Sequence, residues 1–529
     1  MTAKNIIVCA DGTGNKGGYS PDSNVYKIYN AVDKNFSGNA DDGADVGEQI
    51  IFYDNGVGTH KNKYLRALGG ALGFGFGRNV RDLYKFLARN YVEGDRIYFF
   101  GFSRGASTVR ACNGMIAKCG LAKGAGLRNR ELDELVYEAF GCYKRHRKDP
   151  ASAEKLKNSD RSHGAVPVHF LGIWDTVVAL GFPKRTDITG LVTLIMNSLF
   201  WVFEEVLDFF WPHSFYHYKL TDNVEYACQA LSIDDERTAF WPFVWREKNI
   251  EGAADRTTDN VEQVWFAGVH SNVGGGYERA GMAGVALHWM VKRAQRHGLV
   301  FDVNDLADIY SASHIHGRMY NSRDGFGIMY RYHPREIENL CKGRLLEDIK
   351  IHCSVIERLN HRTANYAPGY IPAEFDVVDS EVPSNTIHLD PGKNEYWGKT
   401  RSLIDKTVMY RKRLYGAMLA SIVFVLAAAF YFNNDTQPAE AQNIFLDKVA
   451  NFFYTVLPDF FTGLINVVVV RQPYYFLAAL ILVILYLKVR RILHMKTVRL
   501  CETLRHYIIQ AQEHQLSCNN ISAIKDGNS

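Results

Sequence analysis

The stretch Arg96-Ile-Tyr-Phe-Phe-Gly-Phe-Ser-Arg-Gly-Ala-Ser-Thr-Val-Arg110 decides the fold. Its first part, Ile97 to Phe100, is apolar, aromatic and β-branched, as is typical of a strand buried on both faces. Gly101-Phe-Ser103-Arg-Gly105 follows at once, and small residues that can open a helix come next. A Gly-x-Ser-x-Gly turn between a strand and a helix lifts the serine to the rim of a sheet. We therefore predict Ser103 as a nucleophile on an elbow built by the two glycines; the alternative is a glycine-serine turn without chemistry.

Strand-like and helical segments alternate on both sides of this stretch. Residues 79–90 and 107–119 have helical periodicity, as do 23–32 and 131–147, whereas residues 151–164 are polar and read as a loop. Alternation of this kind predicts an α/β fold with a mainly parallel sheet and helices on both faces. The other predicted strands are Asn5–Ala10, Gln49–Tyr53, Val166–Ile173, Glu225–Ile233 and Val261–Ala267, the last clear one.

Two polar residues stand at the carboxyl ends of predicted strands. Asp175 follows the strand 166–173, and His270 follows the strand 261–267 beside a glycine-rich loop. The alternatives are that Asp175 only caps the turn that follows it, and that His270 is a structural residue whose ring is hydrogen-bonded within the fold. The order Ser103, Asp175, His270 favours catalysis, because carboxyl ends of parallel strands share one edge of the sheet and this chain order is known for such triads. We predict that Asp175 orients His270 and that His270 takes the proton of Ser103.

A glycine-rich loop, Asp11-Gly12-Thr13-Gly14-Asn15, ends the first predicted strand. An N–H of Gly12 or Thr13, together with the N–H of Arg104, is predicted to form an oxyanion hole. A tight turn capped by Asp11 is an alternative that is compatible with this role. The predicted chemistry needs neither a metal nor a cofactor.

The length, net charge and cysteine content of the chain exclude some classes of protein. The chain has 529 residues and a formal net charge of +4, which is no footprint of a nucleic-acid partner. Its nine cysteines are scattered without a Cys-x-x-Cys pair, which favours reduced thiols. The N-terminus leads directly into a strand, so we expect no signal peptide. At this length we predict one large domain over residues 1–400 and an appendage.

The appendage, residues 401–496, is predicted to be a membrane region with helices near 414–432 and 472–489. Leu414 to Phe432 is nineteen residues without a charge, close to the ~20 that cross a bilayer. Basic residues flank the outer ends of both runs, Arg411 to Arg413 on one side and Lys488 to Arg491 on the other. The positive-inside rule then places both ends, and the catalytic domain, in the cytoplasm as part of a multi-pass inner-membrane protein. Two buried core helices are the alternative.

Two further segments are predicted to be helical. Residues 191–211 are apolar and aromatic but carry three acidic residues, which favours a lid or interfacial helix, or else a buried helix. Residues 497–529 are predicted to form a charged, amphipathic terminal helix and tail.

With these residues in place, the chain resembles the bacterial α/β-hydrolase domain family that includes the type VI secretion phospholipase effectors. Six segments carry the resemblance, spread in order over roughly the first 300 residues: Ala10–Asn15, Gly56–Thr59, Gly101–Ala106, Gly172–Val177, Trp265–Tyr277 and, more weakly, Ala230–Trp245.

The resemblance implies an α/β-hydrolase-like fold and a serine esterase acting on lipid, most specifically a phospholipase of the A type with membrane phospholipid as substrate. It implies a delivery or immunity protein as partner if the chain is an effector. Asn272 departs from the family pattern, because relatives usually have Asp beside the histidine. The competing hypothesis is therefore a membrane-bound binding or signalling protein on a degenerate hydrolase fold.

Overall fold

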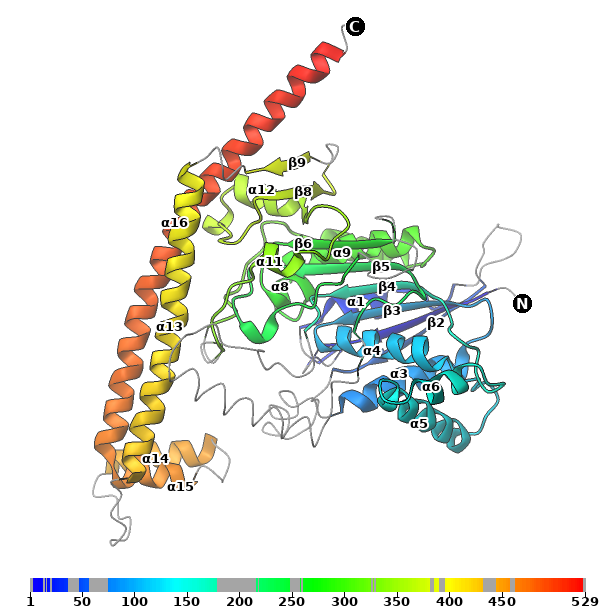
Figure 1. The fold of residues 1–529 in the computed structure, drawn as a ribbon, viewed down its shortest axis with the longest axis horizontal. Helices are drawn as coiled ribbons and strands as arrows, with labels where there is room; N and C mark the ends of the chain where they lie inside the picture. The colour runs from blue at the N-terminus through cyan, green and yellow to red at the C-terminus, as the bar shows by residue number, and fades with distance from the viewer. Residues whose placement is uncertain are drawn as a thin grey trace.

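The computed structural model contains a single mixed sheet with helices on both faces and a long pair of helices beside it (Figure 1). It describes residues 3–12, 15, 17–19, 21–36, 47–56, 75–177, 216, 218–247, 257, 260–324, 327, 330–380, 385–389, 395–431, 444–456 and 462–526.

The described sheet has the order β2-β1-β3-β4-β5-β6-β7-β8-β9, and every neighbouring pair is parallel except β8 and β9. The predicted α/β class with a mainly parallel sheet is therefore confirmed. The strands are β1 (Asn5–Ala10), β2 (Gln49–Asp54), β3 (Arg96–Phe102), β4 (Val168–Trp174), β5 (Val224–Ser232), β6 (Val261–Phe266), β7 (Lys350–His352), β8 (Glu374–Val378) and β9 (Asn385–His388).

Alternate residues of the central strands point to opposite faces, and both faces are covered. Ile6 and Val8 of β1 lie in a core with α3 (Phe76–Asn90), α4 (Arg104–Cys119), α5 (Asn129–Arg145) and α6 (Pro150–Lys157). Ile7 and Cys9 lie in a second core with α1 (Asn24–Ala31), α9 (Gly281–Arg296) and α10 (Val303–Ser311). After their first residues, Asn5 and Arg96, β1 and β3 are therefore apolar, because neither face of the sheet meets water there.

Two sequence predictions are corrected. The segment expected as a polar loop contains α6, which begins because Asp149 accepts the Ser152 N–H and Pro150 fits the first helical turn, and which buries Ala153 and Leu156. The strand 261–267 is not the last, since β7 to β9 extend the sheet. These strands have only three to five residues each, too few to produce a readable pattern.

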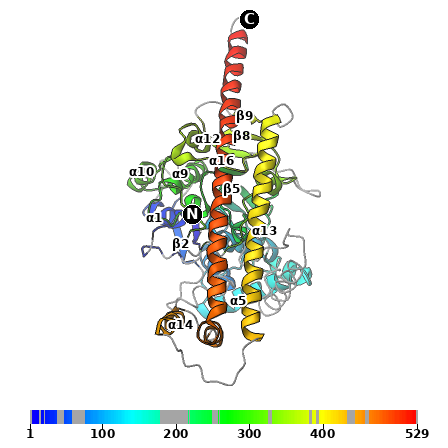
Figure 2. The same ribbon diagram turned by 90° about the vertical axis from the view of Figure 1, so that its left-hand side faces the viewer.

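Two long helices lie side by side against the domain, α13 (Glu395–Tyr431) and α16 (Pro473–Asp526) (Figure 2). Where they meet the domain, Ile404 and Val408 of α13 and Leu504 and Ile508 of α16 are buried in the core around β7 and β8. The carboxyl edge of the sheet faces this pair (Figure 1). Shorter elements complete the fold: η2 (Thr238–Phe240), α11 (Ile337–Cys341), α12 (Cys353–Asn360), η4 (Thr363–Asn365), α14 (Ile444–Val456), α15 (Thr462–Ile465) and a π-helical segment (Asn466–Arg471).

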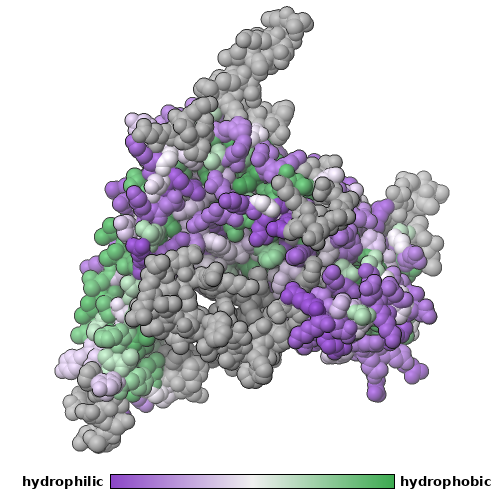
Figure 3. All heavy atoms as spheres, viewed as in Figure 1, coloured by the Kyte–Doolittle hydropathy of each residue, from purple (hydrophilic) through white to green (hydrophobic). Residues whose placement is uncertain are grey.

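The far end of the helix pair exposes apolar side chains. Phe424 of α13 is 75% exposed and Leu477 of α16 is 52% exposed, and hydrophobic side chains gather over this end of the molecule (Figure 3). In the described residues, one helix is long and apolar enough to cross a membrane, Tyr396–Tyr431 within α13. The predicted helix near 414–432 is thus a candidate span, whereas a second span near 472–489, inside α16, stays a prediction. The predicted division at residue 497 also falls inside α16, and residues 191–211 lie outside the described part of the chain.

Candidate active site

Ser103 occupies a sharp turn between the end of β3 and the start of α4. Its backbone has φ 57° and ψ −119°, a strained conformation for a residue with a side chain, and its N–H donates to the carbonyl of Trp174 on β4 at 3.1 Å. A Cβ on Gly105 would lie 2.0 Å from the carbonyl oxygen of Ala10, and a Cβ on Gly101 would lie 2.7 Å from a backbone atom of α4. Only glycine fits at either position, so both predicted elbow glycines are required by close backbone contacts.

Asp175 and His270 meet at the same edge of the sheet. Asp175 directly follows β4, and His270 begins α8 (His270–Gly274) shortly after β6. The Nδ1–H of His270 donates to Oδ2 of Asp175 at 2.5 Å, and both side chains are buried. The ring of Phe102, the residue before Ser103, lies 4.6 Å from the His270 ring between centroids. The turn that carries Ser103 therefore lies beside the histidine–aspartate pair.

A buried arginine, which the sequence pattern did not reveal, binds the carboxylate of Asp175. Arg335 is completely buried and donates to both carboxylate oxygens of Asp175, at 2.6 and 2.7 Å, and to the carbonyl of Ser232. Burial alone would raise the pKa of the Asp175 carboxyl, but the charge and hydrogen bonds of Arg335 outweigh it and hold that pKa well below its usual range. Asp175 therefore stays ionised beside His270. No local motif marks Arg335, which lies 160 residues from its partner.

The surroundings of His270 favour its neutral imidazole. Burial lowers its pKa, and the hydrogen bond to Asp175 only partly offsets this effect. The backbone N–H of His270 donates to Asp235, a buried carboxylate that pairs with Arg237 at 2.7 Å. With Nδ1–H on Asp175, the other ring nitrogen carries the lone pair that a general base needs.

The glycine-rich loop after β1 is organised by its own aspartate. Asp11 is buried and accepts from the Gly12 N–H at 2.6 Å, and it also accepts from the side chains of Asn15, Ser23 and Tyr53. The turn capped by Asp11, offered as an alternative, is thus present. The Gly12 N–H is engaged by it, and Thr13 lies outside the described residues.

The Arg104 N–H stays a predicted oxyanion donor. It is the first residue of α4, so its N–H belongs to the helical turn that has no acceptor within the helix.

Asn272 has a structural reason to be an amide. Its Nδ2 donates to the carbonyl of Arg318, and its Oδ1 accepts from the N–H groups of Val269 and Tyr320. A carboxylate could not supply the first of these bonds. The Asn272 side chain therefore connects α8 to residues 318–320. The carboxylate that contacts the imidazole of His270 is that of Asp175.

The fold and this site define an α/β-hydrolase-type domain. The chain belongs to the family of type VI secretion phospholipase effectors of the Tle1-like kind, since the model of their catalytic domain matches residues 4–293. An uncharacterized protein of Saccharomyces cerevisiae is 30% identical over 205 residues, which are 34% of this chain and 27% of that protein.

Two solved structures are more distant. An uncharacterized protein from Pseudomonas aeruginosa has a TM-score of 0.34 and 15% identity, covering 79% of this chain and 59% of its own. A Tle1 effector bound to the VgrG spike has a TM-score of 0.26 and 16% identity, covering 52% of each chain. The matched regions thus span between about a quarter and three fifths of these relatives.

Proposed function

We propose that the protein is a membrane-anchored serine hydrolase that cleaves carboxylic esters of lipids, specifically a phospholipase of the A type. The hydrogen bond between His270 and Asp175, formed beside the strained turn of Ser103, carries the proposal. Membership of the Tle1-like phospholipase family supports lipid as the substrate class.

In the proposed mechanism, the free ring nitrogen of His270 takes the proton of the Ser103 hydroxyl as its oxygen attacks the acyl carbonyl. Asp175 stabilises the imidazolium that forms, and the Arg104 N–H, with a loop amide such as that of Thr13, binds the oxyanion. His270 then returns the proton to the leaving alcohol, which departs as the acyl-enzyme forms. Water, deprotonated by His270, releases the fatty acid and regenerates Ser103.

The membrane part of the proposal is a hairpin of two spans, the apolar half of α13 and the start of α16. Both helices expose apolar side chains there, and Figure 3 shows them gathered at one end of the pair. Under the positive-inside rule the domain lies in the cytoplasm, and tethering keeps the site beside its substrate. If the chain is delivered as an effector, a delivery partner and an immunity protein belong to the same proposal, which here rests on family membership alone.

The experiment is to label the detergent-solubilised full chain with a fluorophosphonate and to measure phospholipid hydrolysis by mass spectrometry. Ser103→Ala should abolish both labelling and hydrolysis, a loss of at least about 10³-fold, with an unchanged circular dichroism spectrum. Ser107→Ala is the matched control, because this serine lies one turn further along α4 and donates to the Val177 carbonyl. Full hydrolysis by Ser103→Ala would overturn the proposal, and a wild-type chain that neither labels nor hydrolyses would favour the degenerate binding protein.

A further inference from the structure

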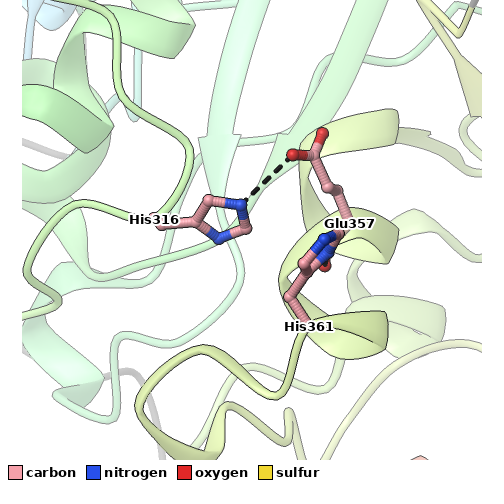
Figure 4. A group of neighbouring side chains, drawn as sticks. All are labelled: His316, Glu357 and His361. Atoms are coloured by element: carbon pink, nitrogen blue, oxygen red, sulfur yellow. Dashed lines mark hydrogen bonds and ion pairs between the residues drawn. The ribbon is translucent and has the colours of Figure 1, made fainter.

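A second group of chemically active side chains lies away from the triad, around α12. Glu357 lies on α12 and His361 directly follows its end, and a spacing of four residues places them on one face. His316, from the segment between α10 and α11, faces them (Figure 4). One ligand-type atom from each side chain can be chosen so that all three lie within 4.8 Å of one another.

We propose that His316, Glu357 and His361 bind a divalent transition-metal ion of the zinc class, with water at the remaining position. The Nε2 of His316 lies 3.3 Å from Oε1 of Glu357. Two ligands at about 2.0–2.2 Å from a tetrahedral Zn²⁺ are roughly 3.3–3.5 Å apart, so this pair already has the spacing of zinc ligands. His361 completes the group, since one of its ring nitrogens lies within the same 4.8 Å cluster.

The hydrogen bonds of the two rings leave the correct nitrogens for the metal. Nδ1 of His316 contacts the hydroxyl of Thr363 at 2.6 Å, and Nδ1 of His361 contacts the carbonyl of Glu357 at 3.0 Å. Metal-binding histidines ordinarily donate their second N–H to such an oxygen, which fixes the tautomer and the ring orientation. With the ring proton on each Nδ1, both Nε2 atoms carry lone pairs. A lone pair of His316 facing a carboxylate at 3.3 Å is repulsive unless a metal ion or a proton lies between them.

The backbone around His316 is fixed independently of any metal. Arg358, which is 1% exposed, donates to the carbonyls of Ile315 and Gly317, the residues on either side of His316. A buried guanidinium on α12 thereby holds the loop against the helix that supplies the other two ligands. The site is preformed, so binding has little ordering cost to overcome.

The position of the site suggests what the metal does. The same loop continues to Arg318 and Tyr320, whose backbones bond to Asn272 in α8, the helix that begins with His270. A metal that crosslinks this loop to α12 stabilises the support of α8 and takes no part in ester cleavage. The inference does not depend on the proposed hydrolysis.

The test measures metal binding to the full chain in detergent after treatment with a chelator. Zn²⁺ bound after desalting should approach one ion per wild-type chain, and Glu357→Gln and His361→Ala should each weaken binding by more than about 100-fold. Zn²⁺ should raise the melting temperature of the wild type but not of Glu357→Gln. Co²⁺ should give d–d bands without a thiolate charge-transfer band, since no cysteine belongs to the site.

His288→Ala is the control, because this half-buried histidine packs on Tyr310 outside the cluster and should leave binding unchanged. Equal zinc binding by wild type and both ligand variants would overturn the proposal. Absence of binding by folded wild-type protein would also overturn it, and would mean that a proton joins His316 to Glu357.

Discussion

The two sides of the candidate active site are stabilised by different means. Ser103 is placed by its own backbone, through two glycines that allow β3, β1 and α4 to approach closely. Asp175 is held by side chains that are distant in sequence, above all by Arg335. The nucleophile side therefore depends on steric fit, and the acid side depends on a buried charge pair.

This difference extends to the helix pair. The segment that carries Arg335 is held by α13: Arg411 donates to the hydroxyl of Tyr332 at 2.5 Å and pairs with Glu236, and Lys412 contacts His333. Arg335 also lines a cavity of about 510 Å³ between the domain and the helix pair. The acid side is thus connected to the helices proposed to enter the membrane, whereas no hydrogen bond or ion pair joins Ser103 to α13 or α16 within the described part of the chain.

Breaking the Arg335–Asp175 pair should change the free energy of unfolding more than any other substitution on either side of the site. Arg335→Met leaves the Asp175 carboxylate buried without its main partner, and loss of one member of such a pair costs about 3–5 kcal/mol of unfolding free energy. Chemical denaturation of the domain measures this loss. Arg279→Met, at an exposed arginine, should change stability by less than about 0.5 kcal/mol.

The pH profile of Arg335→Met shows whether Arg335 influences His270 through Asp175 or only stabilises the fold. Activity requires neutral His270, whose burial lowers its pKa, so the wild-type rate should fall only below the ordinary value of about 6.5 as the pH decreases. Without the guanidinium, Asp175 attracts the imidazolium more strongly and the acidic limb should move to higher pH. Arg335→Lys, which keeps the charge, should restore part of the wild-type limb; an identical limb in all three proteins would show that Arg335 only supports the fold.

A smaller effect is expected on the nucleophile side. Gly105→Ala forces a Cβ against the backbone of β1, and such overpacking costs about 1–3 kcal/mol. Gly141→Ala is the matched control, because that position in α5 has only the end of the Arg145 side chain nearby and should gain up to about 1 kcal/mol. The two melting curves should move in opposite directions, and a neutral Gly105→Ala would contradict the steric account of the elbow.

The smallest effect should come from the contact with α13. Arg411→Met removes the bonds to Tyr332 and Glu236 but leaves Arg335 and Asp175 intact. We expect the hydrolysis rate to fall a few-fold, equivalent to about 1 kcal/mol, with the KM unchanged. A rate equal to that of the wild type would show that the acid side is independent of the helix pair.

The sequence was most informative where the signal is local. Ser103 and Asp175 directly follow strands and His270 follows one within four residues, so alternation of strands and helices was enough to predict one shared edge. No local pattern identifies Arg335, because its role depends on Asp175, which follows a strand 160 residues earlier in the chain. The same reason hid β7 to β9, whose short strands depend on pairing within the sheet, whereas the Glu357–His361 spacing was a local signal that sequence reasoning overlooked.

One continuous helix, α16, has a geometrical consequence. Leu487, the last residue of the uncharged run before Lys488, and Cys501, which is buried against the domain, are fourteen residues apart, about 21 Å along a straight helix. In the proposed membrane-anchored form, this rigid spacer would set the height at which the catalytic edge stands above the lipid surface. Such an enzyme would select its substrates by how far an ester protrudes from the headgroup plane.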